Sequence, residues 1–413
     1  MKKRKIGIIL GFSLIYFGLT FINGVAQMQT EGTQKISSTA FNLKDGDRVV
    51  FLGNSLFEND LRYGYLELAL TTRWPLNEVI FRNLGWSGDT VFGEARTYIT
   101  APSGYDLLVK QLKEARPTVV FIAYGSNEAF EGAKSLPIFV QGLNKLLNEI
   151  EDLGARAVLL STIPMMSSVA EQSRIERNSM LELYNSAISK VAEERGVRFI
   201  NIFKPLLEFN GDTKLSDNGI NLNEKGYHVL ATHIQEGLGL SPTTEPSLTI
   251  DATGQSITGT VKASILKSEK GQEGLDFQVN EKYLPLHKRD TIADDNGFKL
   301  KIDGLKKGSY TLSSNGSELL TASAKDWANG MEIKQQIALD QVHKLHDNIL
   351  KKNQLFFHQY RPMNRTYIIG FRSHEQGRHA EGLEDLSTNI AEFEKQISLN
   401  RMPNPQVYQL RPK

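Results

Sequence analysis

A short polar segment follows an apolar run near the start of the chain and carries a candidate nucleophile. The run Val49–Leu52 is typical of a buried strand, and Gly53, Asn54 and Ser55 follow it directly. A hydroxyl at the carboxyl end of a parallel strand, just before a helix, lies where open α/β sheets bind ligands. The backbone amides there also point toward any anion that forms. Ser55 is therefore the candidate nucleophile, and a plain polar turn is the alternative interpretation.

Two later glycine-containing loops carry suitable hydrogen-bond donors. Gly88 lies in the loop after the apolar run 79–83, and Asn127 lies in the loop after the run 118–124. Acyl transfer needs donors aimed at the oxyanion that develops when a nucleophile attacks a carbonyl group. The backbone N–H groups of Ser55 and Gly88 and the side-chain amide of Asn127 suit that role. Because parallel strands end at the same sheet edge, we expect the three loops to lie close together.

Three neighbours of these groups are expected to contact a substrate. Asn54 precedes the candidate nucleophile, and Glu128 follows the amide donor. Trp86 lies two residues before Gly88, where its ring could stack on a sugar, with core packing as the alternative.

The order of apolar strands and helical stretches predicts the fold that positions these loops. Between residues 41 and 240 the two alternate, which predicts a parallel sheet with helices on both faces. The expected strands are 49–52, 79–83, 118–124, 155–161 and 197–202, and the expected helices are 61–72, 105–115, 136–153, 171–195 and 224–238. After a linker at 241–246, a period-two pattern predicts a small antiparallel β module over 247–337. Residues 338–413 are expected to form a helical C-terminal segment that packs on the first domain, with helices at 341–354 and 382–398.

Together these loops resemble the ordered blocks of a known family. Gly53-Asn54-Ser55 is similar to its first block, Ser87-Gly88-Asp89-Thr90 to its second and Gly125-Ser126-Asn127-Glu128 to its third. The family is the SGNH hydrolases, also called GDSL-type esterases and lipases. The resemblance implies a flavodoxin-like three-layer α/β/α sandwich over about residues 45–240. It also implies ester hydrolysis without a cofactor, with Ser55 as nucleophile and an oxyanion hole from Ser55, Gly88 and Asn127.

The fourth block, residues 215–227, departs from the family at its catalytic positions. The family has Asp, two further residues and then His, and this chain has Asn218 and Asn221 at those places. An amide nitrogen has no basic lone pair, so Asn221 cannot take the Ser55 proton as a histidine would. Asp217 lies one residue early and is kept as a candidate orienting group.

Three alternatives would allow catalysis without the family's histidine. A histidine could come from the last helix of the domain or from the C-terminal segment, where the candidates are His228, His233, His358, His374 and His379. Asp217 or Glu128 could act as a weak base. Residual catalysis could also rest on the oxyanion donors and binding alone.

The N-terminus has the features of a secretory signal peptide, residues 1–26. A basic start, Met1–Lys5, precedes an apolar run, Ile6–Ile22, and small residues lead to a cleavage position after Ala26. An uncleaved membrane anchor is the alternative. The sequence therefore predicts export to the periplasm or the extracellular space, with no membrane association after cleavage.

Composition excludes several classes of protein. The formal net charge is +1 and no basic stripe is present, which argues against a nucleic-acid partner. The chain has no cysteine, which excludes disulfides and thiolate metal sites. His374 and His379 are five residues apart rather than four, so they do not form a zinc-protease helix, and no metal site is expected. The oligomeric state is not predicted.

These observations favour an exported SGNH-type ester hydrolase that acts on a carbohydrate ester such as an acetylated glycan. The alternative is a catalytically degenerate protein of the same fold that binds glycan or cell-envelope ligands without turnover. The changed fourth block and the attached β module support the alternative.

Overall fold

The computed structural model describes most of the chain after its N-terminal region. The described residues are 41–97, 102–209, 214–240, 247–266, 273–286, 297–334, 336–368, 371–372, 374–375 and 379–413. The expected signal peptide lies outside them. Within the part of the chain that is described, no helix is both long and apolar enough to cross a membrane.

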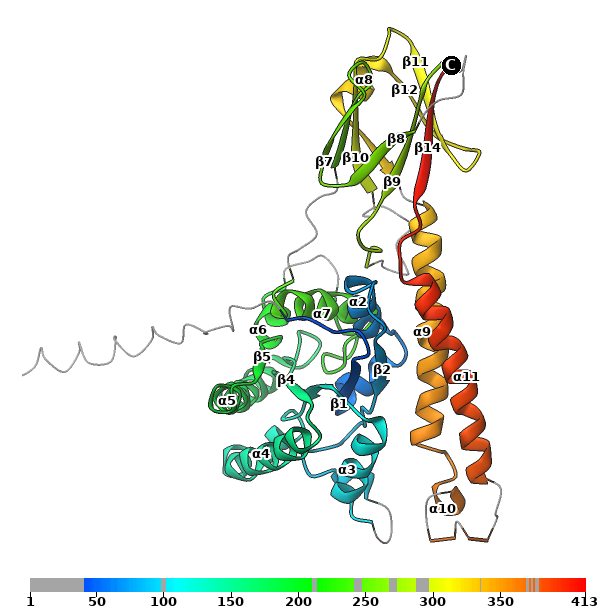
Figure 1. The fold of residues 1–413 in the computed structure, drawn as a ribbon. Coiled ribbons are helices and arrows are strands. Elements are labelled where there is room, and N and C mark those ends of the chain that lie inside the picture. The colour runs from blue at the N-terminus through cyan, green and yellow to red at the C-terminus, as the bar shows by residue number, and fades with distance from the viewer. Residues whose placement is uncertain are drawn as a thin grey trace, which may run out of the picture. The chain divides into compact units, whose positions relative to one another are not determined.

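Five apolar strands form the parallel sheet that the sequence predicts. They are β1 (Arg48–Gly53), β2 (Ile80–Asn83), β3 (Val119–Ala123), β4 (Arg156–Leu160) and β5 (Arg198–Ile200), in the order β2-β1-β3-β4-β5 (Figure 1). All four pairings are parallel. This is the strand order of flavodoxin-like sheets, in which ligands bind beyond the carboxyl ends of the strands.

Helices cover both faces of this sheet, as expected for a three-layer sandwich. One face packs on α2 (Tyr65–Arg73) and α7 (Glu224–Gly237). The other face packs on α3 (Gly104–Ala115), α4 (Leu136–Asp152) and α5 (Glu171–Arg195). Neighbouring residues of β1 alternate between the two cores, which explains why the strand is apolar throughout.

The helix expected at 61–72 begins later, as α2 (Tyr65–Arg73), and a separate short helix precedes it. A first short helix, α1 (Ser55–Asp60), ends before Gly64, which has a φ of 65° and precedes α2. The Asp60 carboxylate accepts hydrogen bonds from the backbone N–H groups of Tyr65 and Leu66 at 3.1 and 3.4 Å. The left-handed glycine and this carboxylate therefore turn the chain between α1 and α2.

The β module contains two sheets and includes the C-terminus of the chain. One sheet has the order β13-β10-β6-β7, from Met331–Lys334, Gly297–Asp303, Ser247–Asp251 and Ser256–Gly259. The other has the order β12-β11-β14-β9-β8, from Ser317–Ser323, Ser309–Ser314, Gln406–Pro412, Leu275–Asn280 and Lys262–Leu266. Their shared core surrounds Trp327 of the short helix α8 (Ala324–Asn329).

Two features of this module correct the sequence analysis. The strands β6 and β10 pair in parallel, so the module is not purely antiparallel. Strand β14 lies between β9 and β11, whereas residues 338–413 were expected to be helical. Its alternating pattern buries Tyr408 and Leu410 in the core of the module, which favours a strand over a helix.

Two long helices return from the β module to the first sheet. These are α9 (Gln336–Tyr360) and α11 (His379–Asn400), which contact each other, with α10 (Arg365–Ile368) between them in the sequence (Figure 1). Apolar residues of α9, including Val342 and Ile349, are part of the core beneath α2 and α7. Arg82 of β2 forms an ion pair with Glu394 of α11.

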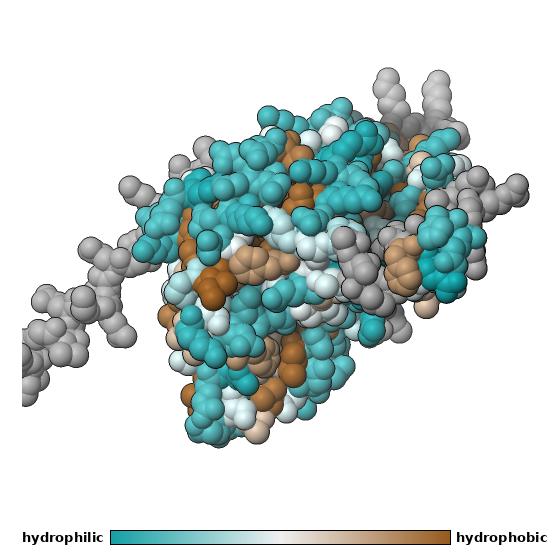
Figure 2. Space-filling model, turned by 90° about the horizontal axis from the view of Figure 1, so that it is seen from below, coloured by the Kyte–Doolittle hydropathy of each residue, from teal (hydrophilic) through white to brown (hydrophobic). Residues whose placement is uncertain are grey.

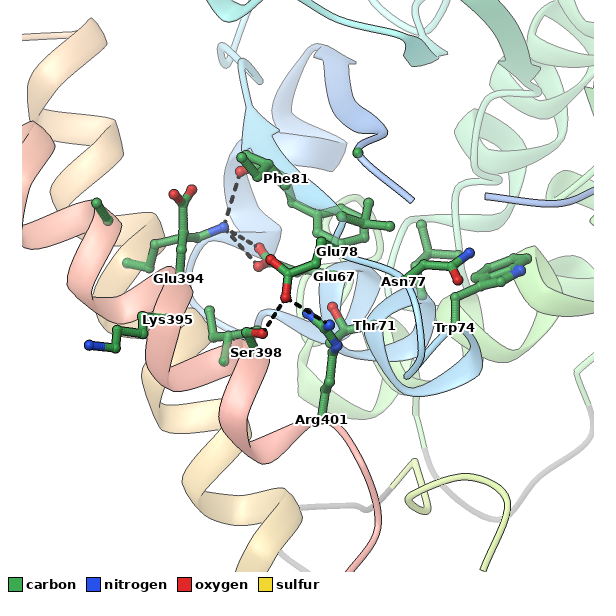
Figure 3. Close-up of a pocket in the computed structure, with 17 residues that line it drawn as sticks. Glu67, Thr71, Trp74, Asn77, Glu78, Phe81, Glu394, Lys395, Ser398 and Arg401 are labelled. Atoms are coloured by element: carbon green, nitrogen blue, oxygen red, sulfur yellow. Dashed lines mark hydrogen bonds and ion pairs between the residues drawn. The ribbon is translucent and has the colours of Figure 1, made fainter. Parts of the chain in front are cut away.

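A cavity of about 420 Å³ lies where α2 and β2 meet α9 and α11, and its wall contains a buried ion pair (Figure 3). The Lys352 ammonium donates to both carboxylate oxygens of Glu67 at 2.8 and 2.7 Å and to the Phe81 carbonyl at 3.1 Å. The two charged side chains are 1% and 4% exposed. Removing one partner of such a pair leaves an uncompensated charge in the interior.

We expect Lys352→Met to lower the free energy of unfolding by about 3–5 kcal/mol, because Glu67 stays buried without its partner. The double variant with Glu67→Leu should recover most of that loss. Urea unfolding followed by circular dichroism measures both. The control is Arg195→Met, whose partner Glu151 is 77% exposed, and its cost should stay below about 1 kcal/mol. Equal losses in Lys352→Met and in the control would contradict the expectation.

Candidate active site

Ser55 is the first residue of α1 and follows directly on the end of β1 and the cap residue Asn54. The Asn54 side chain accepts a hydrogen bond from the Leu56 N–H at 3.1 Å. Its amide nitrogen donates to the Ser126 hydroxyl at 2.7 Å. Asn54 therefore caps the helix that carries Ser55 and ties it to the loop after β3.

The loops after β1 and β3 emerge side by side. Gly53 and Ala123 are paired in parallel register at the ends of their strands. As a result Asn54, Ser55 and Asn127 line one pocket of about 70 Å³, together with Asn221 from the fourth block. The other lining residues are Leu56, Ala123, Tyr124, Ser126, Phe130, Ser161, Thr162, Ile163, Pro164, Met165, Leu181, Ile220, Leu222 and Tyr227.

Exposed apolar side chains also belong to this pocket. Phe130 and Ile220 are 51% and 50% exposed, and both line it. Figure 2 shows the molecule from below, where apolar side chains occur in small groups within a mainly hydrophilic surface. Apolar side chains beside a small polar pocket suit a ligand with both apolar and hydroxyl-bearing parts.

The loop after β2 holds Gly88 and is fixed by the residue that follows it. Gly88 has a φ of 80° and is exposed, and it is not among the residues lining the pocket. Asp89 is fully buried, and its carboxylate accepts from Arg96 at 2.8 Å and from the Tyr124 hydroxyl at 3.0 Å. Burial raises the pKa of the Asp89 carboxyl, and the Arg96 guanidinium acts in the opposite direction.

The Asn127 amide joins this loop to the pocket. Its nitrogen donates one hydrogen bond to the backbone carbonyl of Asp89 at 2.7 Å. An amide nitrogen carries two N–H groups, so this bond orients Asn127 and leaves it a second N–H. The loops after β2 and β3 are therefore linked next to Ser55.

Trp86 and Glu128 do not lie where the sequence analysis expected them. Neither lines the pocket, and they are only 2% and 8% exposed. The Glu128 carboxylate accepts from the backbone N–H groups of Val91 and Gly125 at 2.9 and 2.8 Å. Burial raises the pKa of Glu128, and these two donors oppose the shift. Glu128 joins the two loops instead of contacting a substrate, and Trp86 is part of the interior.

Of the fourth block, Asn221 reaches the pocket and Asp217 does not. Asn221 is exposed, and its side-chain oxygen accepts from the Asn59 amide at 3.3 Å. Asn218 accepts from the backbone N–H of Asn221 at 2.8 Å, which shapes the turn. Asp217 is exposed and accepts from the Asn223 amide at 3.0 Å. The two asparagines thus form a hydrogen-bonded turn, and neither side chain can act as a base toward Ser55.

No histidine is among the residues that line the pocket. The His228 Nε2 atom is hydrogen bonded to the Leu286 carbonyl at 3.0 Å, and the His233 Nδ1 atom is hydrogen bonded to the Glu236 carboxylate at 2.8 Å. His358 lies on α9 and His374 is exposed, while the side chain of His379 is outside the description. Among the described residues, no cluster of three acidic or histidine side chains could hold a metal ion.

Among the described residues that line the pocket, the titratable side chains are two tyrosines, Tyr124 and Tyr227. Burial raises the pKa of each phenol well above its ordinary value, so both stay neutral. The Tyr227 hydroxyl donates to the Leu56 carbonyl at 2.6 Å. The sequence analysis missed Ser161 and Thr162, although they follow β4 and the sheet-edge rule could have found them.

Comparison with known proteins supports the earlier resemblance. Residues 51–229 match the model of the GDSL-like Lipase/Acylhydrolase family. Among curated proteins, no sequence matches the chain. The solved structure of BT4096, a gut microbial diltiazem-metabolizing enzyme, is 18% identical with a TM-score of 0.66, covering 91% of this chain and 99% of that one. This likeness shows the fold, and it extends well beyond the residues of the family match.

Two shorter structures each cover about half of the chain. A GDSL-like lipase from Bacteroides thetaiotaomicron is 19% identical with a TM-score of 0.36, covering 47% of this chain and 88% of that one. A catalytic mutant of Axe2, an acetylxylan esterase from Geobacillus stearothermophilus, is 18% identical with a TM-score of 0.39, covering 49% of this chain and 98% of that one.

We expect Glu128→Gln to lower the free energy of unfolding by about 2 kcal/mol, because a glutamine offers one oxygen to two backbone donors. Glu131→Gln is the matched control, since Glu131 is exposed at the end of the same short helix (Glu128–Glu131). Urea unfolding of both variants measures the difference. Equal stability of the two variants would show that the carboxylate does not hold these loops together.

Proposed function

Because residues 51–229 form a GDSL-like lipase/acylhydrolase domain, we propose that the protein is an exported ester hydrolase with Ser55 as its nucleophile. The substrate class that we propose is carbohydrate esters, such as acetylated glycans. The observation that carries this proposal is that Ser55 and the Asn127 amide line the same pocket at the carboxyl edge of the sheet. The signal-like N-terminus supports export.

The proposed reaction proceeds through an acyl-enzyme. The Ser55 oxygen attacks the ester carbonyl carbon, and the carbonyl oxygen becomes an oxyanion. The N–H groups of Ser55 and Gly88 and the second N–H of Asn127 stabilise that oxyanion. The alcohol then leaves, and water attacks the acyl group to release the acid and restore Ser55.

The proton of Ser55 has an unusual destination in this proposal. Asn221 cannot accept it, so the proton passes to solvent, and the leaving alkoxide takes a proton from solvent. Rate enhancement then rests on the oxyanion donors and on binding, which retain measurable catalysis when a triad member is missing. We therefore expect slow turnover.

The lining of the pocket supports a neutral, hydroxyl-bearing substrate. Its polar groups are amides and hydroxyls, and it contains no charged side chain. The Thr162 hydroxyl is buried and has no hydrogen-bond partner among the described residues, although Thr162 lines the pocket. A buried unsatisfied hydroxyl gains most from a ligand that hydrogen bonds to it.

A second candidate function has its own observation. The described residues that line the pocket include no histidine, aspartate or glutamate. This favours a protein of the same fold that binds glycan or cell-envelope ligands without turning them over.

Reaction with a fluorophosphonate, followed by intact-mass analysis, separates the two functions. If Ser55 is nucleophilic, the wild-type protein gains one adduct that Ser55→Ala lacks. Ser186→Ala is the control and should keep the adduct, because the Ser186 side chain is exposed on α5 and outside the pocket. A wild-type protein that gains no adduct and hydrolyses 4-nitrophenyl acetate no faster than Ser55→Ala would refute the hydrolase, and calorimetric titration with acetylated glycans would then test binding.

Restoring the family's acid–base pair should raise the rate. We expect the double variant Asn218→Asp, Asn221→His to increase kcat for 4-nitrophenyl acetate by at least about 100-fold, which is the range for a positioned general base. Asn221→Gln is the matched control and should leave kcat near the wild-type value. A folded double variant with no gain would mean that the Asn221 position does not face Ser55.

A further inference from the structure

The C-terminal end of α9 contacts the loop that carries the proposed oxyanion donor. We propose that Tyr360 and Arg361 are positioning residues that hold this oxyanion loop, residues 84–89, against α1. The inference rests on the proposed roles of Ser55 and Gly88. Both positioning residues lie outside the family match at 51–229.

The first contact passes through Glu58 of α1, one turn beyond Ser55. The Glu58 carboxylate accepts from the backbone N–H of Ser87, directly before Gly88. The same carboxylate oxygen accepts from the Arg361 guanidinium at 2.8 Å. The Arg361 and Glu58 side chains are 27% and 21% exposed, so the pair is largely shielded from water. Arg361 thereby fixes the carboxylate that orients the peptide next to the oxyanion donor.

The second contact fixes the start of the oxyanion loop. The Tyr360 hydroxyl donates to the Gly85 carbonyl at 2.7 Å. A Cβ atom on Gly85 would lie 2.3 Å from the Glu58 backbone nitrogen, so the loop is in close contact with α1 at this point. A shift of the loop therefore acts directly on the helix that begins at Ser55.

A third set of contacts surrounds Trp86 in the middle of the loop. The guanidinium groups of Arg361, Arg96 and Arg365 lie 4.0, 5.1 and 5.2 Å from the centre of its ring. Arg365 also donates to the Arg96 carbonyl at 2.7 Å. Cations over an aromatic face are attracted to it, most strongly where water is excluded. Two of the three cations come from the C-terminal segment.

The far end of the loop is connected to the same helix end. Arg96, the partner of Asp89, donates to the Gln111 side-chain oxygen at 2.6 Å. The Gln111 amide in turn donates to the Tyr360 carbonyl at 3.0 Å. Residues on both sides of Gly88 are thus connected by hydrogen bonds to the C-terminal end of α9. Gly85 is bonded directly, Ser87 through Glu58, and Asp89 through Arg96 and Gln111.

Such positioning affects the transition state more than substrate binding. An oxyanion donor acts only on the charge that develops during attack, and small displacements reduce its effect steeply. Loss of the Arg361 contact should therefore lower kcat and leave KM nearly unchanged. A purely structural role would lower the free energy of unfolding without lowering kcat at an unchanged KM.

The test uses the full-length chain with Arg361→Met, Arg361→Lys and Tyr360→Phe. We expect Arg361→Met to lower kcat for 4-nitrophenyl acetate about tenfold at unchanged KM, with Arg361→Lys intermediate because it keeps the charge. The control is Arg372→Met, since Arg372 pairs with Glu375 at the surface and should not alter kcat. Hydrogen–deuterium exchange of the amides of residues 85–89 should become at least about tenfold faster in Arg361→Met and stay unchanged in Arg372→Met.

Exchange and kinetics separate the two proposals. Unchanged kcat and unchanged exchange in both Arg361→Met and Tyr360→Phe would overturn the positioning role. A uniform rise in exchange over the whole protein would also overturn it, since that shows general loss of stability. If the wild-type protein has no turnover, the proposed hydrolase fails, and faster exchange confined to residues 85–89 would still support the positioning contact.

Discussion

All strands of a parallel sheet end at the same edge, and this constraint places the candidate nucleophile and the candidate oxyanion donors. Ser55 follows β1, Gly88 follows β2, and Asn127 follows β3. The register between Gly53 and Ala123 brings the first and third of these loops together at one level. Residues that are more than 70 positions apart therefore line one pocket.

Uncharged polar groups line the pocket, and charged side chains lie around it. The lining offers amides, hydroxyls and backbone groups, whereas Asp89, Arg96 and Glu128 lie behind it with partners in neighbouring loops. Burying a charge is favourable only when it is paired and hydrogen bonded, so these residues fix backbone positions. No ionisable acceptor is among the described residues that line the pocket, which is the main chemical difference from the SGNH pattern. In the proposed reaction this limits how the Ser55 proton can leave.

Polar contacts connect the C-terminal half of the chain to the first domain, and they join residues that are far apart in the sequence. Lys352 neutralises Glu67 in the interior, and Arg361 reaches Glu58 on the helix of Ser55. After α11 the chain returns to the β module as strand β14 and completes its second sheet. The chain therefore leaves the β module through α9 and comes back to it after α11.

The sequence by itself determined the elements and motifs whose physical causes are local. Apolar runs predicted all five strands of the parallel sheet. The polar segments after β1 and β3 predicted three of the residues that line the pocket, Asn54, Ser55 and Asn127. The replacement of the family's acid and base by Asn218 and Asn221 was also readable, because it depends on residue type alone.

Only the tertiary structure decided the roles that depend on distant partners. The Glu128 carboxylate accepts hydrogen bonds from two backbone N–H groups. The Trp86 ring is contacted by arginines from both halves of the chain. Strand β14 forms because β9 and β11 leave a place between them for an alternating segment. Local propensity does not record which side chain far along the chain will supply a carboxylate or a guanidinium with its partner, and in this protein such long-range pairs surround the candidate site.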